Sequence, residues 1–432
     1  MKLKLFGIIV FIGLSAALIG CSSETGQSKG GEVTIEFMHT SVEQERLKVV
    51  NGLIQKFEED NPNINIDPVV VEEGSLSTKI ITLAQAGELP EVIEVGQQHA
   101  KMLDKNALVD TDALKSVIED IGKEEYFDGT LKLVRTEDGK GFRGVPISGW
   151  VQGIWYNKEM LASKGFEEPQ NWEELLEIAE AFTDKANQKY GIALPTVEGN
   201  LSEQAFSQFA LSNNANILNA NGEITLSTPE MKESLTYYKK LSQYTMPGSN
   251  GVTEVKDAFM NGTAPMAIYS TYILPAVYAQ GDPSNLGYAI PKKEQEAVFG
   301  TVSSLTIPSG LEEQKKKAAQ TFVKYLSKTE NATEWILMAP GGAQPVHKSV
   351  VASETYQSNK VINAFGDLST EIAESFNEIQ VFGLVENKNF VKMGDISSSN
   401  AIPIMMNQVT VGDASVEEGI KAAQEQLDKV LE

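Results

Sequence analysis

Residues 33–38 read Val33-Thr34-Ile35-Glu36-Phe37-Met38, and this alternation of apolar and polar side chains is typical of a β-strand. Apolar residues at helical spacing follow over 47–57, and this predicted helix stops at Asn61-Pro62. The same order then recurs as a strand over 64–71, a helix over 80–84 that ends at Gly87, and a strand over 91–95. Strands that alternate with helices are typical of a parallel sheet covered by helices, so the sequence predicts an α/β fold.

Polar residues follow each of these three strands. The strand ends read His39-Thr40-Ser41, Glu72-Glu73-Gly74 and Gly96-Gln97-Gln98-His99. Such sheets bind their ligands beyond the carboxyl ends of the strands, so His39, Glu73, Gln97 and Gln98 are candidate ligand-binding residues. Imidazole, carboxylate and amide groups suit a ligand rich in hydroxyl groups. Loops are also polar simply because they meet water, and this alternative stays open for each residue.

The N-terminus has the features of an export signal. A basic start is followed by an apolar run over 5–19 and by the small residue Gly20 before Cys21. The run is shorter than the ~20 residues of a membrane-spanning helix, which disfavours a permanent transmembrane anchor. Leu18-Ile19-Gly20-Cys21 is similar to a bacterial lipobox, although an ordinary signal peptide followed by a buried cysteine is an alternative. We therefore expect a signal peptide over 1–20, a lipid on Cys21 and a flexible tether over 21–31. The lipid would hold the protein at the extracytoplasmic face of the cell membrane.

Composition narrows the classes of partner. The chain has 432 residues, and removal of residues 1–20 leaves 34 Lys and Arg against 59 Asp and Glu, a net charge of −25. A surface of this charge repels nucleic acid and anionic lipid headgroups, so neither is an expected partner. Arg46, Arg135 and Arg143 are the only arginines, and this scarcity favours a neutral ligand over a phosphate or a dicarboxylate. The single cysteine excludes an intramolecular disulfide.

Several short motifs follow one another along nearly all of residues 32–430. They are Phe57-Glu58-Glu59-Asp60-Asn61-Pro62-Asn63-Ile64, Ala86-Gly87-Glu88-Leu89-Pro90-Glu91-Val92, Gly144-Val145-Pro146 continuing to Tyr156-Asn157-Lys158, Pro169-Gln170-Asn171-Trp172-Glu173-Glu174-Leu175, Phe259-Met260-Asn261-Gly262 through Met266, and the looser Gly341-Gly342-Ala343-Gln344-Pro345-Val346. In this order they resemble the bacterial extracellular solute-binding proteins of the sugar-binding group, which are receptors of ABC importers related to maltose-binding protein. One departure is Glu91, where the family usually has Asp.

The resemblance implies the two-lobed periplasmic-binding-protein type II fold, with a hinge and a ligand cleft between the lobes. It further implies a monomer that closes around one carbohydrate, an oligosaccharide by preference, and presents it to a two-subunit ABC permease in the membrane. We expect the chain to cross between the lobes near Ser148, near Ser270 and in the helix before Pro340. The expected division is as follows: lobe 1 over 32–148 and 271–329, and lobe 2 over 149–270 and 330–432.

Aromatic and polar residues near these crossings are further candidates. Aromatic rings suit the apolar face of a pyranose, and the resemblance places Trp150 and Tyr272 where the family contacts its ligand. Trp150 could instead be a structural tryptophan. Gln344 is added to the polar candidates, and Gly342 could let the backbone approach the ligand or form a plain turn. Trp155 and Trp172 are expected in the core, and Trp335 is ambiguous.

Other functions receive less support. An exported glycosidase needs a defined pair of carboxylates, and no motif selects one pair among the 59 acids. Tyr237-Tyr238 resembles the paired tyrosines of iron-binding relatives, but helical spacing over 231–241 places one ring in the core and the other toward water. Glycerol phosphate and polyols stay open as ligands. We expect no catalytic residue, no metal site and no cofactor.

Overall fold

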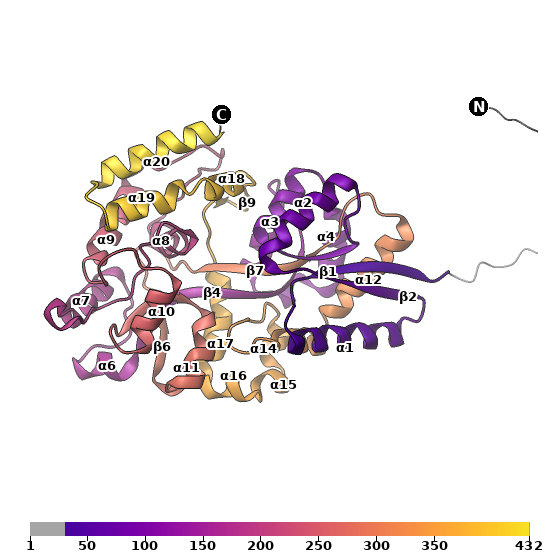
Figure 1. The fold of residues 1–432 in the computed structure, drawn as a ribbon, viewed down its shortest axis with the longest axis horizontal. Helices are drawn as coiled ribbons and strands as arrows, with labels where there is room; N and C mark the ends of the chain where they lie inside the picture. Colours follow the sequence, from indigo (N-terminus) through magenta and orange to yellow (C-terminus); the bar gives the residue numbers. More distant parts are fainter. Residues whose placement is uncertain (1–30, 432) are drawn as a thin grey trace, which may run out of the picture.

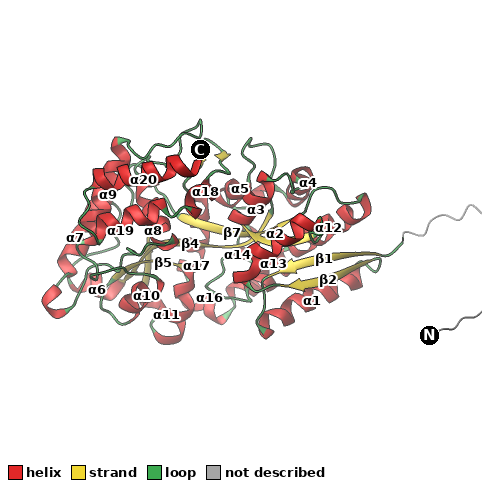
Figure 2. Cartoon of the chain, turned by 45° about the horizontal axis from the view of Figure 1, so that its top comes forward, coloured by secondary structure: helices red, strands yellow, loops and turns green. Residues whose placement is uncertain are grey.

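The computed structural model describes residues 31–431, so the expected signal peptide and Cys21 lie outside the described residues. Seven strands form one sheet in the order β2-β1-β3-β7-β4-β5, and β6 pairs with β4 beside this path. The sheet runs through the length of the molecule, with helices on both of its faces (Figure 1, Figure 2). Its strands are β1 (Val33–His39), β2 (Ile64–Val70), β3 (Val92–Gly96), β4 (Val145–Asn157), β5 (Met266–Ser270), β6 (Leu286–Ala289) and β7 (Phe299–Thr306).

The N-terminal strands confirm the predicted parallel unit. β1 pairs in parallel with β2 on one side and with β3 on the other. The helix α1 (Gln44–Asp60) buries Val50, Leu53, Ile54 and Phe57 against this sheet. It ends at Asn61, whose Nδ2 donates to the carbonyl oxygen of Phe57 over 2.9 Å. The helix α2 (Leu76–Ala86) ends at Gly87, whose φ of 72° is a left-handed conformation that glycine adopts without strain.

Two long antiparallel strands join the halves of the molecule. β4 pairs with β7 from Val145 to Gln152, and from there to Asn157 it pairs with β5 and β6. Two large hydrophobic cores lie on either side of this crossing, one around Phe37 and Phe322 and the other around Phe206 and Tyr238. The α/β class and the two-lobed fold are therefore confirmed. The exact division into lobes stays a proposal, because β6, expected in lobe 1, pairs with Ile154–Asn157 of the expected lobe 2.

Helices cover both halves. The half around β1 holds α3 (Gln97–Lys105), α4 (Thr111–Ile121), α5 (Asp128–Val134), α12 (Glu313–Leu326) and α13 (Thr329–Ile336). The other half holds α6 (Lys158–Ser163), α7 (Trp172–Phe182), α8 (Asn200–Ser212), α9 (Pro229–Ser242), α10 (Val252–Met260), α18 (Met393–Ser398), α19 (Ala401–Thr410) and α20 (Val416–Leu431). Below the crossing strands in Figure 1 lie α11 (Leu274–Gln280), α14 (Lys348–Ala352), α15 (Glu354–Gln357), α16 (Lys360–Phe365) and α17 (Asp367–Glu374).

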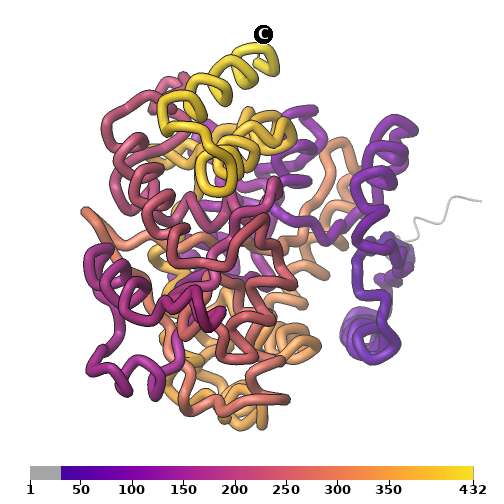
Figure 3. Tube along the Cα trace, turned by 60° about the vertical axis from the view of Figure 1, so that its left-hand side comes forward, coloured from indigo at the N-terminus to yellow at the C-terminus, as the bar shows by residue number. Residues whose placement is uncertain are grey.

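The C-terminal helices pack on segments distant in sequence. In Figure 3 the yellow helices α19 and α20 lie on the segment that holds α8 and α9. Asn407 donates to the carbonyl oxygen of Thr196 over 2.7 Å, and Lys239 donates to that of Ala414 over 2.8 Å. The chain therefore leaves the second half after α10 and returns to it at its C-terminal end.

The tryptophans expected in the core are there. Trp155 is fully buried, and its Nε1 donates to the carbonyl oxygen of Tyr269 over 2.6 Å. Trp172 is buried and stacks on Tyr237, with the ring centroids 4.3 Å apart. Of the tyrosine pair, Tyr238 is the ring in the core, and the expectation that the other ring faces water is wrong. Tyr237 is half-buried because this stacking covers its ring, and its hydroxyl donates to the carbonyl oxygen of Trp172 over 2.6 Å.

Candidate ligand-binding cleft

A cleft of about 370 Å³ lies where the first parallel strands meet the crossing strands. This volume is in the range of small-molecule sites, which occupy ~300–1,000 Å³. Its walls come from the ends of β1 and β3, from β4 and β7, from α8, and from the segment around α13. The lining residues include Thr40, Ser41, Arg46, Glu73, Glu94, Gln97, Gln98, His99, Trp150, Asn200, Gln204, Tyr272, Phe299, Ser303, Trp335 and Met338.

Aromatic side chains line the cleft from separate elements. Trp150 is half-buried in β4, and its ring lies 5.6 Å from that of Phe299 in β7. Tyr272 follows β5, and 47% of its surface is exposed. Trp335 of α13, which the sequence left ambiguous, is buried and lines the cleft. These rings can cover the apolar face of a flat ligand.

A carboxylate that the sequence analysis missed lies at the cleft. Glu94 accepts hydrogen bonds from the amide of Thr40 over 3.2 Å and from the hydroxyl of Ser303 over 2.9 Å. Burial raises the pKa of the Glu94 carboxyl, and these hydrogen bonds oppose the increase. The sequence could have indicated this residue, because a charged side chain at Glu94 is unusual within an otherwise apolar strand that is buried on both faces.

The start of α3 adds amide and imidazole groups to the cleft. Gln97 and Gln98 follow Gly96 directly, and Oε1 of Gln97 is buried with no hydrogen-bond partner among residues 31–431. Nε2 of His99 lies 2.7 Å from the hydroxyl of Ser77. Burial lowers the pKa of His99, and the negative charge of Glu73 opposes this shift. These groups offer both donors and acceptors to a polar ligand.

The family pattern described as bacterial extracellular solute-binding protein matches residues 41–333. This protein belongs to that family. It is 50% identical over 423 residues to the putative ABC transporter periplasmic-binding protein YcjN of Escherichia coli K12, and the alignment covers 98% of each chain. Among solved structures, the sugar-binding protein MalE of Xanthomonas citri is 20% identical and superposes with a TM-score of 0.77, covering 92% of this chain and 97% of the other. A cyclo/maltodextrin-binding protein complexed with maltotetraose is 18% identical with a TM-score of 0.75, covering 94% and 99%.

Five of the predicted ligand residues line the cleft of this solute-binding protein. They are Glu73, Gln97, Gln98, Trp150 and Tyr272. The cleft thus combines an amide-rich rim with aromatic rings, as the polar strand ends and the crossing positions predict.

The other three predicted residues lie behind its walls. His39 is fully buried beside Phe37, and its Nδ1 accepts from the amide of Ser41 over 3.3 Å. Burial lowers the pKa of His39 to about 4, so the ring is neutral at pH 7. Gln344 is also buried, and its backbone exchanges hydrogen bonds of 2.8 and 3.0 Å with Gly149, which precedes Trp150. Gln344 therefore positions the strand that carries Trp150.

Gly342 supports an aromatic wall of the cleft. A Cβ atom at this position would lie 2.7 Å from Cδ1 of Tyr272, closer than real Cβ contacts occur. The carbonyl oxygen of Gly342 accepts from the hydroxyl of Thr271 over 2.7 Å. The missing side chain therefore lets the ring of Tyr272 lie directly on the backbone.

The described part of this solute-binding protein offers neither a metal site nor a membrane span. Residues 31–431 hold no group of three or more His, Cys, Asp or Glu side chains placed to bind a metal ion. Over the same residues no helix is both long and apolar enough to span a bilayer.

Proposed function

We propose that this protein captures a carbohydrate in the cleft, without converting it, and delivers it to a two-subunit ABC permease. The observation that carries the proposal is the pairing of Trp150 and Tyr272 with the amide groups of Gln97 and Gln98 in one cleft. A sugar ring has an apolar face that the aromatic rings can cover and hydroxyl groups that can form hydrogen bonds with the amides. Two structural neighbours are described as a sugar-binding protein and as a cyclo/maltodextrin-binding protein, which supports the same class of ligand.

Hinge closure is the proposed mechanism of a monomeric receptor. The lining residues come from both halves of the molecule, for example Gln98 of α3 and Asn200 of α8. A ligand that contacts both halves binds the closed form more tightly and shifts the population toward it. β4 and β7 pass from one half to the other, and bending within them would allow this motion without breaking either core.

Thermal unfolding with a ligand panel tests the proposal. Residues 22–432 would be heated with maltose, maltotetraose, D-tagatose, ribitol, sn-glycerol 3-phosphate and Fe³⁺. A ligand at 100 times its Kd adds ~2.7 kcal/mol to the free energy of unfolding, so we expect a clear increase in Tm with one sugar series. An increase in Tm only with sn-glycerol 3-phosphate or Fe³⁺ would leave the assignment of the fold unchanged but would mean that the ligand is not a carbohydrate. Cleavage of a panel sugar would replace binding by catalysis.

The charges in the cleft favour a neutral ligand over an anion. The relative UgpB of Salmonella typhimurium, an sn-glycerol-3-phosphate-binding periplasmic protein, is 26% identical over 336 residues. In this chain Arg46 is the one guanidinium at the cleft within residues 31–431, and its Nε lies 3.6 Å from a carboxylate oxygen of Glu43. Glu73 and Glu94 also line the cleft and would repel a phosphate.

We also propose that a lipid on Cys21 anchors the protein at the extracytoplasmic face of the membrane. Support comes from Leu18-Ile19-Gly20-Cys21 after an apolar run, since a thiol is needed to carry the lipid. Cys21→Ser should therefore move the protein from the membrane fraction to the soluble fraction, or leave it with its signal peptide uncleaved. Fractionation and mass measurement of the product check this, with Ser22→Ala as the control that keeps the cysteine. A Cys21→Ser protein that is processed and still held in the membrane would contradict the lipid anchor.

A further inference from the structure

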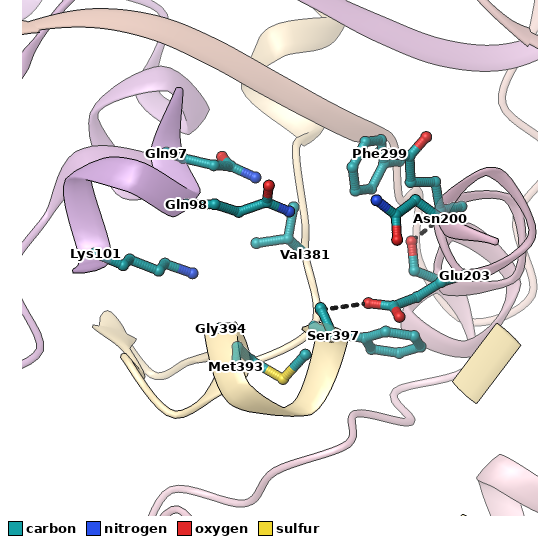
Figure 4. Close-up of a pocket in the computed structure, with 13 residues that line it drawn as sticks. Gln97, Gln98, Lys101, Asn200, Glu203, Phe299, Val381, Met393, Gly394 and Ser397 are labelled. Carbon is teal, nitrogen blue, oxygen red and sulfur yellow. Dashed lines mark hydrogen bonds between the residues drawn. The ribbon is translucent and has the colours of Figure 1, made fainter. Parts of the chain in front are cut away.

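A small second pocket opens beside the cleft. It has a volume of about 60 Å³ and lies between α3, α8 and α18 (Figure 4). It shares lining residues with the cleft, among them Gln97, Gln98 and Asn200, so the two spaces adjoin. A buried water needs ~10–15 Å³, so this pocket has room for a group of a few heavy atoms. It is much smaller than the 370 Å³ of the cleft, which is the part that suits a sugar ring.

Lys101 enters this pocket from α3. The residue is only 6% exposed, and Figure 4 shows its Nζ pointing into the pocket. No carboxylate among residues 31–431 forms an ion pair with it, whereas Lys105, one turn further along α3, pairs with Asp395 over 2.9 Å. Burial lowers the pKa of Lys101 to about 7. The negative charge of Glu137 opposes this shift. The ammonium group carries three N–H donors, so it can donate to a polar group that enters the pocket from the cleft.

Glu203 enters the same pocket from α8, on the opposite wall. Its Oε1 accepts from the hydroxyl of Ser397 over 2.8 Å, which Figure 4 shows as a dashed line. Its Oε2 is buried and has no hydrogen-bond partner among the described residues. Burial also raises the pKa of the Glu203 carboxyl. The pocket thus has the ammonium donor of Lys101 on one wall and the Glu203 carboxylate on the facing wall, where Oε1 keeps a lone pair beyond its bond to Ser397.

We propose that this pocket is a side subsite that takes one hydroxymethyl or hydroxyl group of a sugar bound in the cleft, with Lys101 as donor and Glu203 as acceptor. The inference rests on the proposed carbohydrate function. A hydroxyl group both donates and accepts, so it is complementary to a pocket that offers a donor and an acceptor. A carboxylate or phosphate group would gain from Lys101 but meet the repulsion of Glu203, so the subsite selects a neutral polar group.

Titration calorimetry with deoxy sugars tests the subsite. Residues 22–432 are titrated with maltose, D-glucose, D-tagatose and ribitol, and then with each monodeoxy form of the compound that binds most tightly. Loss of the hydroxyl group held by the pocket should weaken binding to the wild type at least about tenfold, as for hydrogen bonds to charged groups. Lys101→Met and Glu203→Gln should bind the parent compound at least about fivefold more weakly, yet bind that one deoxy form as well as the parent. Glu203→Gln removes the carboxylate charge and leaves one neutral oxygen in place of two charged acceptors, which is the cause of its expected loss.

The controls separate the subsite from the wider function. Lys240→Met on α9 and Glu177→Gln on α7 change exposed side chains of the same types and should leave every affinity within a factor of two. If Lys101→Met and Glu203→Gln discriminate against every deoxy form as the wild type does, the pocket is not a subsite. If the wild type binds none of these compounds and only the phosphate or the metal raises its Tm, the carbohydrate function itself fails, and the subsite falls with it.

Discussion

Trp150→Ala should increase the Kd for the bound carbohydrate by about 5- to 150-fold, which is ~1–3 kcal/mol of binding free energy. The physical cause is the loss of one aromatic face against the apolar side of a sugar ring. Trp150 lies on β4 where the strand lines the cleft, and Phe299 holds its ring from one side. Calorimetric titration with the sugar that gives the largest increase in Tm would measure the change.

The same substitution should leave the fold intact. The backbone of Trp150 pairs with Thr301 of β7 whatever the side chain, and the ring is half-buried at a cleft and does not fill a core. We expect the Tm of the ligand-free variant to stay within a few degrees of the wild type. Trp150→Phe is the matched control, since it keeps an aromatic face and should lose much less affinity. An unchanged Kd in Trp150→Ala would remove this residue from the binding site.

The sequence predicts the fold well where structure depends on local periodicity. The strands and helices of 33–95 and the helix Trp172–Phe182 lie where the apolar pattern places them. The pairing of β7 between β3 and β4 was not foreseeable, because it joins segments that lie between 147 and 213 positions apart in the sequence. For the same reason the predicted lobe boundary at 271 separates β6 from the strand to which it is hydrogen-bonded.

The sequence predicts which loops reach the candidate site, but it predicts less well which of their side chains point into it. The polar strand ends do reach the cleft, with Glu73, Gln97 and Gln98 among its lining residues. His39 is the last residue of β1, and its side chain points into the core, while the next residues reach the cleft. Strand-end reasoning identifies the right turn, but the direction of each side chain depends on packing that sequence alone does not supply.

Arg143 shows the largest gap between sequence and structure. In the sequence it counts only as one of three arginines, yet in the fold it is fully buried. Its Nε donates to Oδ2 of Asp104 over 2.7 Å, and its terminal nitrogens donate to the carbonyl oxygens of Arg135 over 2.6 Å and Asn389 over 3.1 Å. Asn389 in turn donates to the carbonyl oxygen of Leu133 over 2.7 Å. One guanidinium therefore ties α3, the segment before β4 and the segment before α18 together.

Arg143→Met should lower the free energy of unfolding by about 3–5 kcal/mol, because removing one partner of a buried ion pair leaves the other polar groups without theirs. Asp104 would lose its cation, and the carbonyl oxygens of Arg135 and Asn389 would lose their donors. Urea unfolding gives the change as a shift of the midpoint at constant slope. Arg143→Lys should be nearly as damaging, since an ammonium group lacks the planar fork that reaches acceptors in three directions.

Arg135→Met is the control for this prediction. Within residues 31–431 its side chain makes one hydrogen bond, to Asn387 over 3.4 Å, which is exposed and long. Exposed polar contacts of this kind contribute ~0–1 kcal/mol, so the control should unfold near the wild-type midpoint. An equal shift in both variants would mean that the Arg143 network adds nothing beyond surface charge. A large shift in Arg143→Met alone would mean that the buried guanidinium, with its acceptors on Asp104, Arg135 and Asn389, contributes the stability that a surface arginine does not.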